Sequence, residues 1–254
     1  MTIINVPKDV RIAVISDIHE HEFQFNKAIA VIKPSEKIWA VSVGDLFEKG
    51  FGIDCANNII STFMGLSNKD RGFVVKGNHD IKVIKKAKKD KVSNKYVDWM
   101  NQRPLSYSFR FCNGRRLTIV HGGVTPRMLE TDLDNNTDLC YIRWVDSLGN
   151  HVPYVYKMDG DKKMMVPARE CISWHEAYDG RFGTILSGHH SQKDGVPKFY
   201  KHSANLDSAV YVTGRLTVQM FDENGLGDLL FFDGPAKYSS AADFYKSMAL
   251  DEIR

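Results

Sequence analysis

Residues 11–19 read RIAVISDIH, a short apolar run that passes directly into an aspartate and a histidine. The same arrangement recurs in IWAVSVGD at 38–45 and in GFVVKGNH at 72–79. Short apolar runs that end in turn residues predict buried strands, and helical spacing at 22–32 and 53–64 separates the three runs. Strands that alternate with helices predict an α/β fold with a largely parallel sheet and helices on its faces.

Side chains of metal-ligand type follow these strands and two later apolar runs, at 116–120 and 184–187. The residues at the five run ends are Asp17, His19, Asp45, Asn78, His79, His121 and His189. Functional residues of such sheets gather beyond the carboxyl ends of the strands, so we expect these side chains to converge. A single Asp in this position is usually a helix cap, but caps alone do not explain the ordered set. Carboxylates, imidazoles and an amide oxygen suit Mn²⁺, Fe or Zn²⁺, and two-metal hydrolytic sites hold such ions roughly 3.5–4 Å apart.

The rest of the chain predicts hairpins, further helices and a helical tail. Asn113-Gly114 between alternating runs predicts one hairpin, and a second is expected at 152–166 around Asp159-Gly160. Helices are expected at 137–145 and 168–178, and late strands at 208–212, 216–221 and 228–232. The segment 239–254 has helical apolar spacing and is expected to pack on the domain.

Length and composition set the broad class. The chain has 254 residues, 43% hydrophobic and 26% charged, which fits one large globular domain. A net charge of +3 gives no general argument for binding nucleic acid or a membrane. No apolar run is long enough to cross a bilayer, and the N-terminal segment lacks the apolar core of a secretory signal. The four cysteines have no paired spacing, so we expect reduced thiols in a cytoplasmic protein.

Five motifs, in order along the chain, resemble those of the calcineurin-like metallophosphoesterases. They are DIH at 17–19, GDLFEKG at 44–50, GNHD at 77–80, HGG at 121–123 and GHH at 188–190. NLDS at 205–208 and GRLT at 214–217 are similar to the ending of the phosphoprotein phosphatase branch, which includes serine/threonine phosphatases and diadenosine tetraphosphatases. Ser191 stands where other branches carry a second metal-binding histidine, which also favours this branch.

The resemblance implies a fold of two packed mixed β-sheets, a β-sandwich, flanked by helices. It implies a metallophosphoesterase catalytic domain at 1–235 and a C-terminal helical tail at 236–254, packed on that domain. It also implies two divalent metal ions, Mn²⁺ with Fe, Zn²⁺ or Ni²⁺ as alternatives, and a bridging hydroxide that attacks phosphorus. The implied metal ligands are Asp17, His19, Asp45, Asn78, His121 and His189, with Asp45 as the bridge.

Further roles follow from the same resemblance. His79 would be the general acid, and Glu48 would orient it. The implied phosphate-binding residues are Lys49, Asn78 and Arg143. The family's DRG is EKG here, and Lys49 supplies charge without the bidentate geometry of an arginine. His190 replaces the threonine of GHT, and we expect it to line the substrate or to support the ligands.

The expected activity is metal-dependent hydrolysis of a phosphoric ester, by a phosphomonoesterase resembling the serine/threonine protein phosphatases. Alternatives are a dinucleoside polyphosphate (diadenosine tetraphosphate) hydrolase, a nucleic-acid end phosphatase and, outside the enzymes, a metal-binding interaction scaffold. The expected partner is a phosphorylated protein, nucleotide or nucleic-acid end, with no membrane and no obligate protein partner.

Two further segments lie outside these motifs. Seven lysines crowd the segment 82–95 after His79, as in a solvated helix face or in a flank that guides a polyanion. The hairpin at 152–166 is expected to overhang the site and to set specificity.

Overall fold

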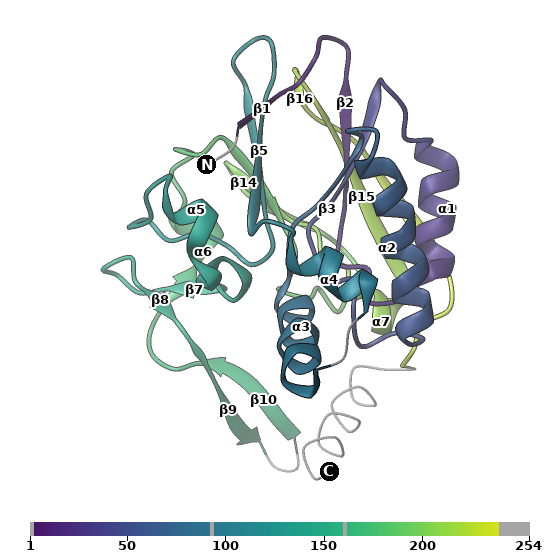
Figure 1. The fold of residues 1–254 in the computed structure, drawn as a ribbon. Coiled ribbons are helices and arrows are strands. Elements are labelled where there is room, and N and C mark those ends of the chain that lie inside the picture. Colours follow the sequence, from purple (N-terminus) through teal and green to yellow (C-terminus); the bar gives the residue numbers. More distant parts are fainter. Residues whose placement is uncertain (1–2, 92–93, 160–161, 239–254) are drawn as a thin grey trace.

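Two mixed β-sheets pack against each other and are flanked by helices (Figure 1). The structure is a computed structural model that describes residues 3–91, 94–159 and 162–238. The first sheet has the strand order β16-β15-β2-β3-β4, and the second has the order β1-β5-β6-β12-β14-β13. The expected fold class is therefore confirmed.

The first sheet contains the three strands that the opening sequence motifs predicted. Its parallel strands are β2 (Arg11–Ile15), β3 (Ile38–Ser42) and β4 (Gly72–Val74). The antiparallel strands β15 (Arg215–Asp222) and β16 (Gly225–Asp233) continue the sheet beyond β2. The helices α1 (Glu22–Ile32) and α2 (Ile53–Ser67) connect the parallel strands, as their helical spacing predicted.

The second sheet is built around a hairpin, to which three strands add in parallel and one adds antiparallel. Its strands are β1 (Ile3–Asn5), β5 (Ser106–Arg110), β6 (Arg116–Val120), β12 (Thr184–Ser187), β14 (Ser203–Asn205) and β13 (Lys198–Phe199). β5 and β6 form the hairpin predicted at Asn113-Gly114. β12 lies parallel to both β6 and β14, so β6 and β12 deliver their last residues to the same edge.

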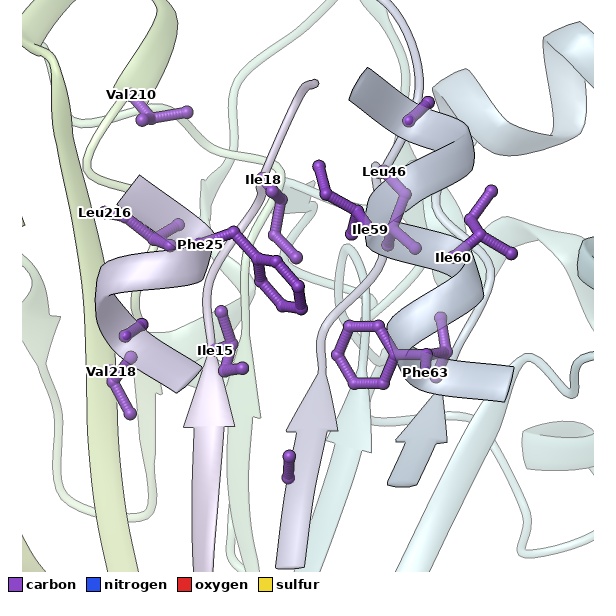
Figure 2. Close-up of a cluster of buried hydrophobic side chains, with 14 of the residues drawn as sticks. Ile15, Ile18, Phe25, Leu46, Ile59, Ile60, Phe63, Val210, Leu216 and Val218 are labelled. Atoms are coloured by element: carbon purple, nitrogen blue, oxygen red, sulfur yellow. The ribbon is translucent and has the colours of Figure 1, made fainter. Parts of the chain in front are cut away.

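Strand β2 is apolar without alternation because both of its faces are buried. Ile12 and Val14 pack into the layer between the sheets, together with Phe109 and Leu186. Ala13 and Ile15 point to the opposite face, since successive side chains of a strand alternate. On that face Phe25 of α1 and Phe63 of α2 close a second core (Figure 2). Each fully buried aromatic or aliphatic side chain of this kind stabilises the fold by roughly 1.5–3 kcal/mol.

Short elements and an extended arm occupy the edge of the sheets. The helices are α3 (Asn78–Asp90), α4 (Lys95–Asn101), α5 (Asp132–Asn135), α6 (Trp174–Ala177) and α7 (Val210–Thr213), with a 3₁₀ turn at Thr137–Cys140. A three-stranded sheet joins β11 (Ile172–Ser173), β7 (Trp144–Val145) and β8 (His151–Val152). The arm consists of β9 (Tyr154–Asp159) and β10 (Lys162–Pro167), which pair only with each other among the described strands. It is the predicted hairpin, shortened because Val152 pairs with β7 instead.

Three sequence-based expectations were wrong. The segment 208–212, predicted as a strand, contains the helical turn α7, which buries Val210 and Tyr211. The helix expected at 137–145 is a 3₁₀ turn followed by β7, and the helix expected at 168–178 is reduced to α6 after β11. In each case burial of apolar side chains in the surrounding structure outweighs local propensity.

The C-terminal part of the prediction is left open. The helix expected at 239–254 lies outside the described residues, so the division into a catalytic domain at 1–235 and a tail at 236–254 stays a prediction. Over the parts of the chain that the structure describes, none of the helices combines the length and the apolar character needed to span a membrane.

Candidate metal centre

Residues from both sheets meet at the carboxyl ends of five strands. Asp17, Asp45 and Asn78 follow β2, β3 and β4 of the first sheet. His121 and His189 follow β6 and β12 of the second sheet. The structure therefore brings together the side chains that the sequence pattern grouped, as the rule for carboxyl ends of parallel strands predicted.

Asp17, His19 and Asp45 form one buried group. Their side chains are at most 1% exposed, and one potential ligand atom from each lies within 4.8 Å of the others. Asp45 is central, because its Oδ2 lies 3.6 Å from Nε2 of His19 and 3.4 Å from Nε2 of His121. This carboxylate therefore faces both halves of the site.

Asn78, His121 and His189 form the second half. The side-chain oxygen of Asn78 lies 3.0 Å from Nε2 of His121 and 2.7 Å from Nδ1 of His189. The rings of His121 and His189 meet edge to face at 5.0 Å. Three donor atoms from three different segments thus converge beside Asp45.

Backbone carbonyls fix one nitrogen of each of the three histidines. Nδ1 of His19 lies 3.2 Å from the Phe47 carbonyl, and Nδ1 of His121 lies 2.9 Å from the Val43 carbonyl. Nε2 of His189 lies 3.3 Å from the carbonyl of Tyr141. A carbonyl can only accept, so the nitrogen facing it carries a proton, and the other nitrogen of the neutral ring directs its lone pair into the site. Metal-binding histidines are oriented in this way.

One buried carboxylate oxygen of this centre lacks a hydrogen-bond partner among the described residues. Oδ2 of Asp17 accepts a bond of 3.0 Å from the His189 amide, but its Oδ1 has no partner and no solvent access. Such an atom carries a desolvation penalty that a cation would remove. Carboxylates, imidazoles and an amide oxygen are the ligands that first-row divalent ions accept, so the residues present fit a metal centre.

The pKa shifts of the group point the same way. Burial raises the pKa of Asp17 well above its usual range, and the charge of Asp207 adds to this. Burial lowers the pKa of His19 and of His189 well below the ordinary value. Burial opposes the charged form of His121 as well, but Asp45 raises the pKa of this histidine to about 9. The proton on His121 therefore occupies a place that a cation would take, and metal binding would release it.

His79 and Glu48 form a pair at the rim of this centre. Nδ1 of His79 lies 2.6 Å from Oε2 of Glu48, and the His79 amide donates to Oδ1 of Asp45 at 2.9 Å. The His79 ring meets the His19 ring edge to face at 5.1 Å. Lys82 holds the other oxygen of Glu48 at 3.0 Å. The structure thus fixes His79 through its Nδ1 and leaves Nε2 as the atom available for proton transfer.

Three cations surround the same rim. Nζ of Lys49 lies 3.4 Å from Nε2 of His19 and 4.8 Å from the centre of the Tyr211 ring. Nζ of Lys193 lies 4.5 Å from the centre of the same ring.

Arg143, the third cation, donates to the His189 carbonyl at 3.2 Å and lies over the ring of Tyr154, the first residue of the arm. His190 packs edge to face against Trp144 at 5.7 Å, and its carbonyl accepts a bond from Asn205.

Two buried or half-buried carboxylates that the sequence did not single out hold the loops in place. Asp80 accepts four backbone N–H bonds of 2.8 to 3.2 Å, from Asp45, Leu46, Phe47 and Gly77. Glu20 accepts bonds of 2.9 to 3.2 Å from the amides of Glu48, Gly50 and Gly52. Burial and the charge of Asp45 raise the pKa of Asp80 to about 7 despite its four donors. The only local signal for Asp80 was its place as the last residue of GNHD.

These loops need such support because their backbone is strained. Five site residues have left-handed φ angles between 46° and 69°: His19, Asp45, Glu48, Lys49 and His189. Non-glycine residues rarely adopt this conformation, and it persists where the surrounding structure imposes it. The bonds to Asp80 and Glu20 provide that constraint for the segment 45–52.

The backbone at two glycines of the motifs packs closely against the carboxylates of the site. A Cβ atom on Gly188 would lie 1.7 Å from Oδ1 of Asp17, and one on Gly77 would lie 2.1 Å from Oδ1 of Asp45. Glycine is therefore required at both motif positions so that the carboxylates can approach the neighbouring strand ends.

Comparisons with known proteins agree with this geometry. The family model of the calcineurin-like phosphoesterases matches residues 10–235. A search of curated proteins returns no match.

Solved structures share the fold. One described as a putative diadenosine tetraphosphatase is similar with a TM-score of 0.69 and 19% identity, over 92% of this chain and 98% of that chain. A protein serine/threonine phosphatase from Saccharomyces cerevisiae with similarity to human phosphatase PP5 gives a TM-score of 0.54 and 17% identity, over 94% of this chain and 85% of that chain. At these identities the structures support the fold, and the family match covers most of the chain. The chain therefore belongs to the calcineurin-like phosphoesterase family, whose members are metal-dependent phosphoester hydrolases with a dinuclear metal site.

Proposed function

We propose that the chain is a phosphomonoesterase of the serine/threonine protein phosphatase type. The observation that carries this proposal is the His79–Glu48 pair, which lies directly beside a buried set of metal-ligand atoms. A metal centre alone would suit a binding protein, whereas a proton donor next to it suits hydrolysis of an ester.

Six residues would hold two divalent cations. Asp17, His19 and Asp45 would hold the first ion, and the second would take Asn78, His121 and His189, with Asp45 shared. Bound cations would supply Lewis acidity towards the phosphoryl oxygens. We propose Mn²⁺ as the ion, because the set mixes carboxylate, imidazole and amide ligands and contains no thiolate.

His79 would protonate the oxygen of the leaving group. Its Nδ1–H bond to Glu48 keeps the ring in place and favours its charged form, while Nε2 carries the proton to be transferred. Burial lowers the pKa of His79, and Lys49 lowers it further. Asp45 and Glu48 oppose this lowering and favour the imidazolium, the form in which Nε2 has a proton to transfer.

Phosphate would be bound by Lys49, Asn78 and Arg143. Arg143 is kept in place through its bond to the His189 carbonyl and offers a planar pair of donors. Lys49 contributes charge from the EKG motif at 48–50, where the family carries an arginine. The proximity of its Nζ to His19 supports a position at the metal-facing side of the substrate.

The test is hydrolysis by metal-stripped protein with and without added Mn²⁺. Substrates are p-nitrophenyl phosphate, a phosphothreonine peptide and diadenosine tetraphosphate. Mn²⁺-dependent turnover of the monoesters is the expected result. Turnover restricted to diadenosine tetraphosphate would replace the proposal by a dinucleoside polyphosphate hydrolase. Tight binding of two ions without turnover on any substrate would leave a metal-binding scaffold. The cytoplasmic location expected from the sequence is part of the same proposal.

A further inference from the structure

Helix α3 leads from the catalytic rim to the surface. It spans 13 residues, begins with Asn78 and His79 at the metal centre and runs away from the ends of the sheet strands (Figure 1). Its exposed side chains include five lysines, at positions 82, 85, 86, 88 and 89. A polyanion bound at His79 could therefore follow this helix outwards.

The lysines share a face with His79. The buried side of α3 carries Asp80, Ile81 and Ile84. Residues spaced by three or four along a helix lie on one side, and the sequence places lysines at three, seven and ten residues after His79. Lys82, the first of them, contacts Glu48 at the rim, so this face does reach the site. With about 1.5 Å of rise per residue, the last lysine lies roughly 15 Å from His79 along the helix axis.

Helix stability does not explain this charge. Lysines three and four residues apart repel each other, which destabilises an isolated helix. Lys88 and Lys89 complement the dipole at the C-terminal end of the helix, but Lys85 and Lys86 lie in its middle. Within the described residues, Lys85, Lys86 and Lys89 have no carboxylate within ion-pair distance. Among the described residues, therefore, no acidic side chain pairs with these three lysines.

We propose that Lys82, Lys85, Lys86 and Lys89, called here the lysine stripe, bind the phosphodiester backbone of a nucleic acid whose terminal phosphate enters the metal centre. This inference rests on the proposed phosphomonoesterase. Nucleic acid fits because it carries one negative charge per nucleotide at regular spacing, which a row of lysines on one face complements. A phosphopeptide offers one phosphate and no regular row of charges.

The reaction would be removal of the terminal phosphate. Water adds to phosphorus, and the bond from phosphorus to the terminal sugar oxygen breaks. That oxygen takes a proton from His79, and the water that adds gives up one proton, which restores His79 by way of solvent. The products are inorganic phosphate and a hydroxyl-ended nucleic acid. The lysine stripe takes no part in these bonds and acts only by holding the chain.

The test compares two substrates with the same ester chemistry. They are a nucleoside 5′-monophosphate and a short single-stranded oligonucleotide with a 5′ phosphate. The variant is Lys85→Gln/Lys86→Gln/Lys89→Gln, which spares Lys82 because that residue contacts Glu48. A control with the same change of charge is Lys8→Gln/Lys37→Gln/Lys69→Gln. These exposed lysines precede β2, β3 and β4 at the opposite edge of the sheet.

We expect kcat/KM for the oligonucleotide to exceed that for the monophosphate and to fall steeply with salt. Each charge on a single strand contributes about 0.7 to the logarithmic salt slope, so the stripe variant should lose about 2 from it. When salt is raised from about 50 to 200 mM, kcat/KM for the oligonucleotide should fall in both proteins. The factor by which it falls should be roughly 15 times smaller in the stripe variant than in the wild type. The monophosphate and p-nitrophenyl phosphate should be hydrolysed equally by all three proteins.

Two results would overturn the inference without touching the proposed function. One is equal kcat/KM and equal salt dependence for the oligonucleotide and the monophosphate in the wild type. The other is an equal effect of the stripe and control substitutions. Loss of p-nitrophenyl phosphate turnover in every protein, with Mn²⁺ present, would instead refute the phosphomonoesterase itself.

Discussion

Replacing Asp80 with Asn should destabilise the protein although Asp80 is not among the proposed metal ligands. Its two carboxylate oxygens each accept two backbone N–H bonds, Oδ2 from Asp45 and Gly77 and Oδ1 from Leu46 and Phe47. A carboxamide keeps one acceptor oxygen and turns an NH₂ group towards the other two donors. Whichever way it lies, two buried N–H groups lose their acceptor and face a donor.

The size of the effect follows from these two bonds. Above pH 7 the Asp80 carboxyl is ionised in the folded state, because its pKa is raised to about 7. Relief of the buried charge, which together with Asp45 raises the pKa of Asp80, offsets part of the change in Asp80→Asn. Two buried donors that lose their acceptor cost about 2–6 kcal/mol before this offset. That is a large fraction of the roughly 5–15 kcal/mol that stabilises a folded domain.

The assay is thermal unfolding at pH 8 in the presence of a chelator, which removes any contribution from bound metal. In a chain of this length about 1 kcal/mol shifts Tm by about 2–4 °C, so Asp80→Asn should lower Tm by about 2–4 °C for each kcal/mol that remains after the offset. Asp90→Asn is the matched control, since Asp90 is the exposed last residue of the same helix. If both variants shifted Tm by the same small amount, Asp80 would not hold the loop after β3.

Four other outcomes test the proposed site and the fold. Asp45→Asn should reduce Mn²⁺-dependent turnover by more than about 100-fold and lower the metal content, since even partners of metal ligands contribute roughly 10–100-fold; normal activity would refute the two-metal assignment. His79→Asn should cut kcat by about 10²–10⁴ for esters with poor leaving groups and by much less for p-nitrophenyl phosphate, with metal content unchanged; equal losses would exclude the general-acid role. Lys49→Arg should keep kcat and maintain or lower KM in steady-state assays, because arginine adds a planar fork that binds phosphate in a bidentate way; a collapse would show that the site is built around lysine. Burial lowers the pKa of His175 from an ordinary 6.5 to about 3. Between these pH values the unfolded chain therefore binds one more proton than the folded chain. The free energy of unfolding then falls as the pH is lowered from about 6.5 towards 3. In urea titrations across this window, His175→Phe should reduce the pH dependence of the unfolding free energy by about one proton, and an unchanged slope would show that His175 is protonated in the folded state.

The sequence predicted those parts of the site that are encoded locally. The six proposed ligands follow the five strands β2, β3, β4, β6 and β12, so the rule for carboxyl ends was sufficient to predict that Asp17, Asp45 and His189 lie together. The helix expected at 22–32 and the strand expected at 184–187 have the observed bounds, because their apolar spacing alone determines which face is buried.

What the sequence did not predict depends on contacts between distant segments. Asp80 and Glu20 bind backbone groups about 30 residues away, and nothing in their immediate neighbours signals this. Tyr211 lies beside Lys49 and Lys193 only because α7 replaces the expected strand. The apolar Val210-Tyr211-Val212 favours a strand by propensity, but Val210 and Tyr211 are buried from a helical turn that ends at the left-handed Gly214.

Because the proposed metal ligands come from both sheets, they are synthesised at different times. Asp17, His19 and Asp45 leave the ribosome early, whereas His189 follows more than half a chain length later. At about 5–20 residues per second the first three ligands wait roughly 7–30 s for the last one. During that interval the nascent chain offers an incomplete site with weaker discrimination among ions. The metal that the mature enzyme contains would then depend on which ions are present in the compartment during synthesis, as well as on the affinity of the finished site.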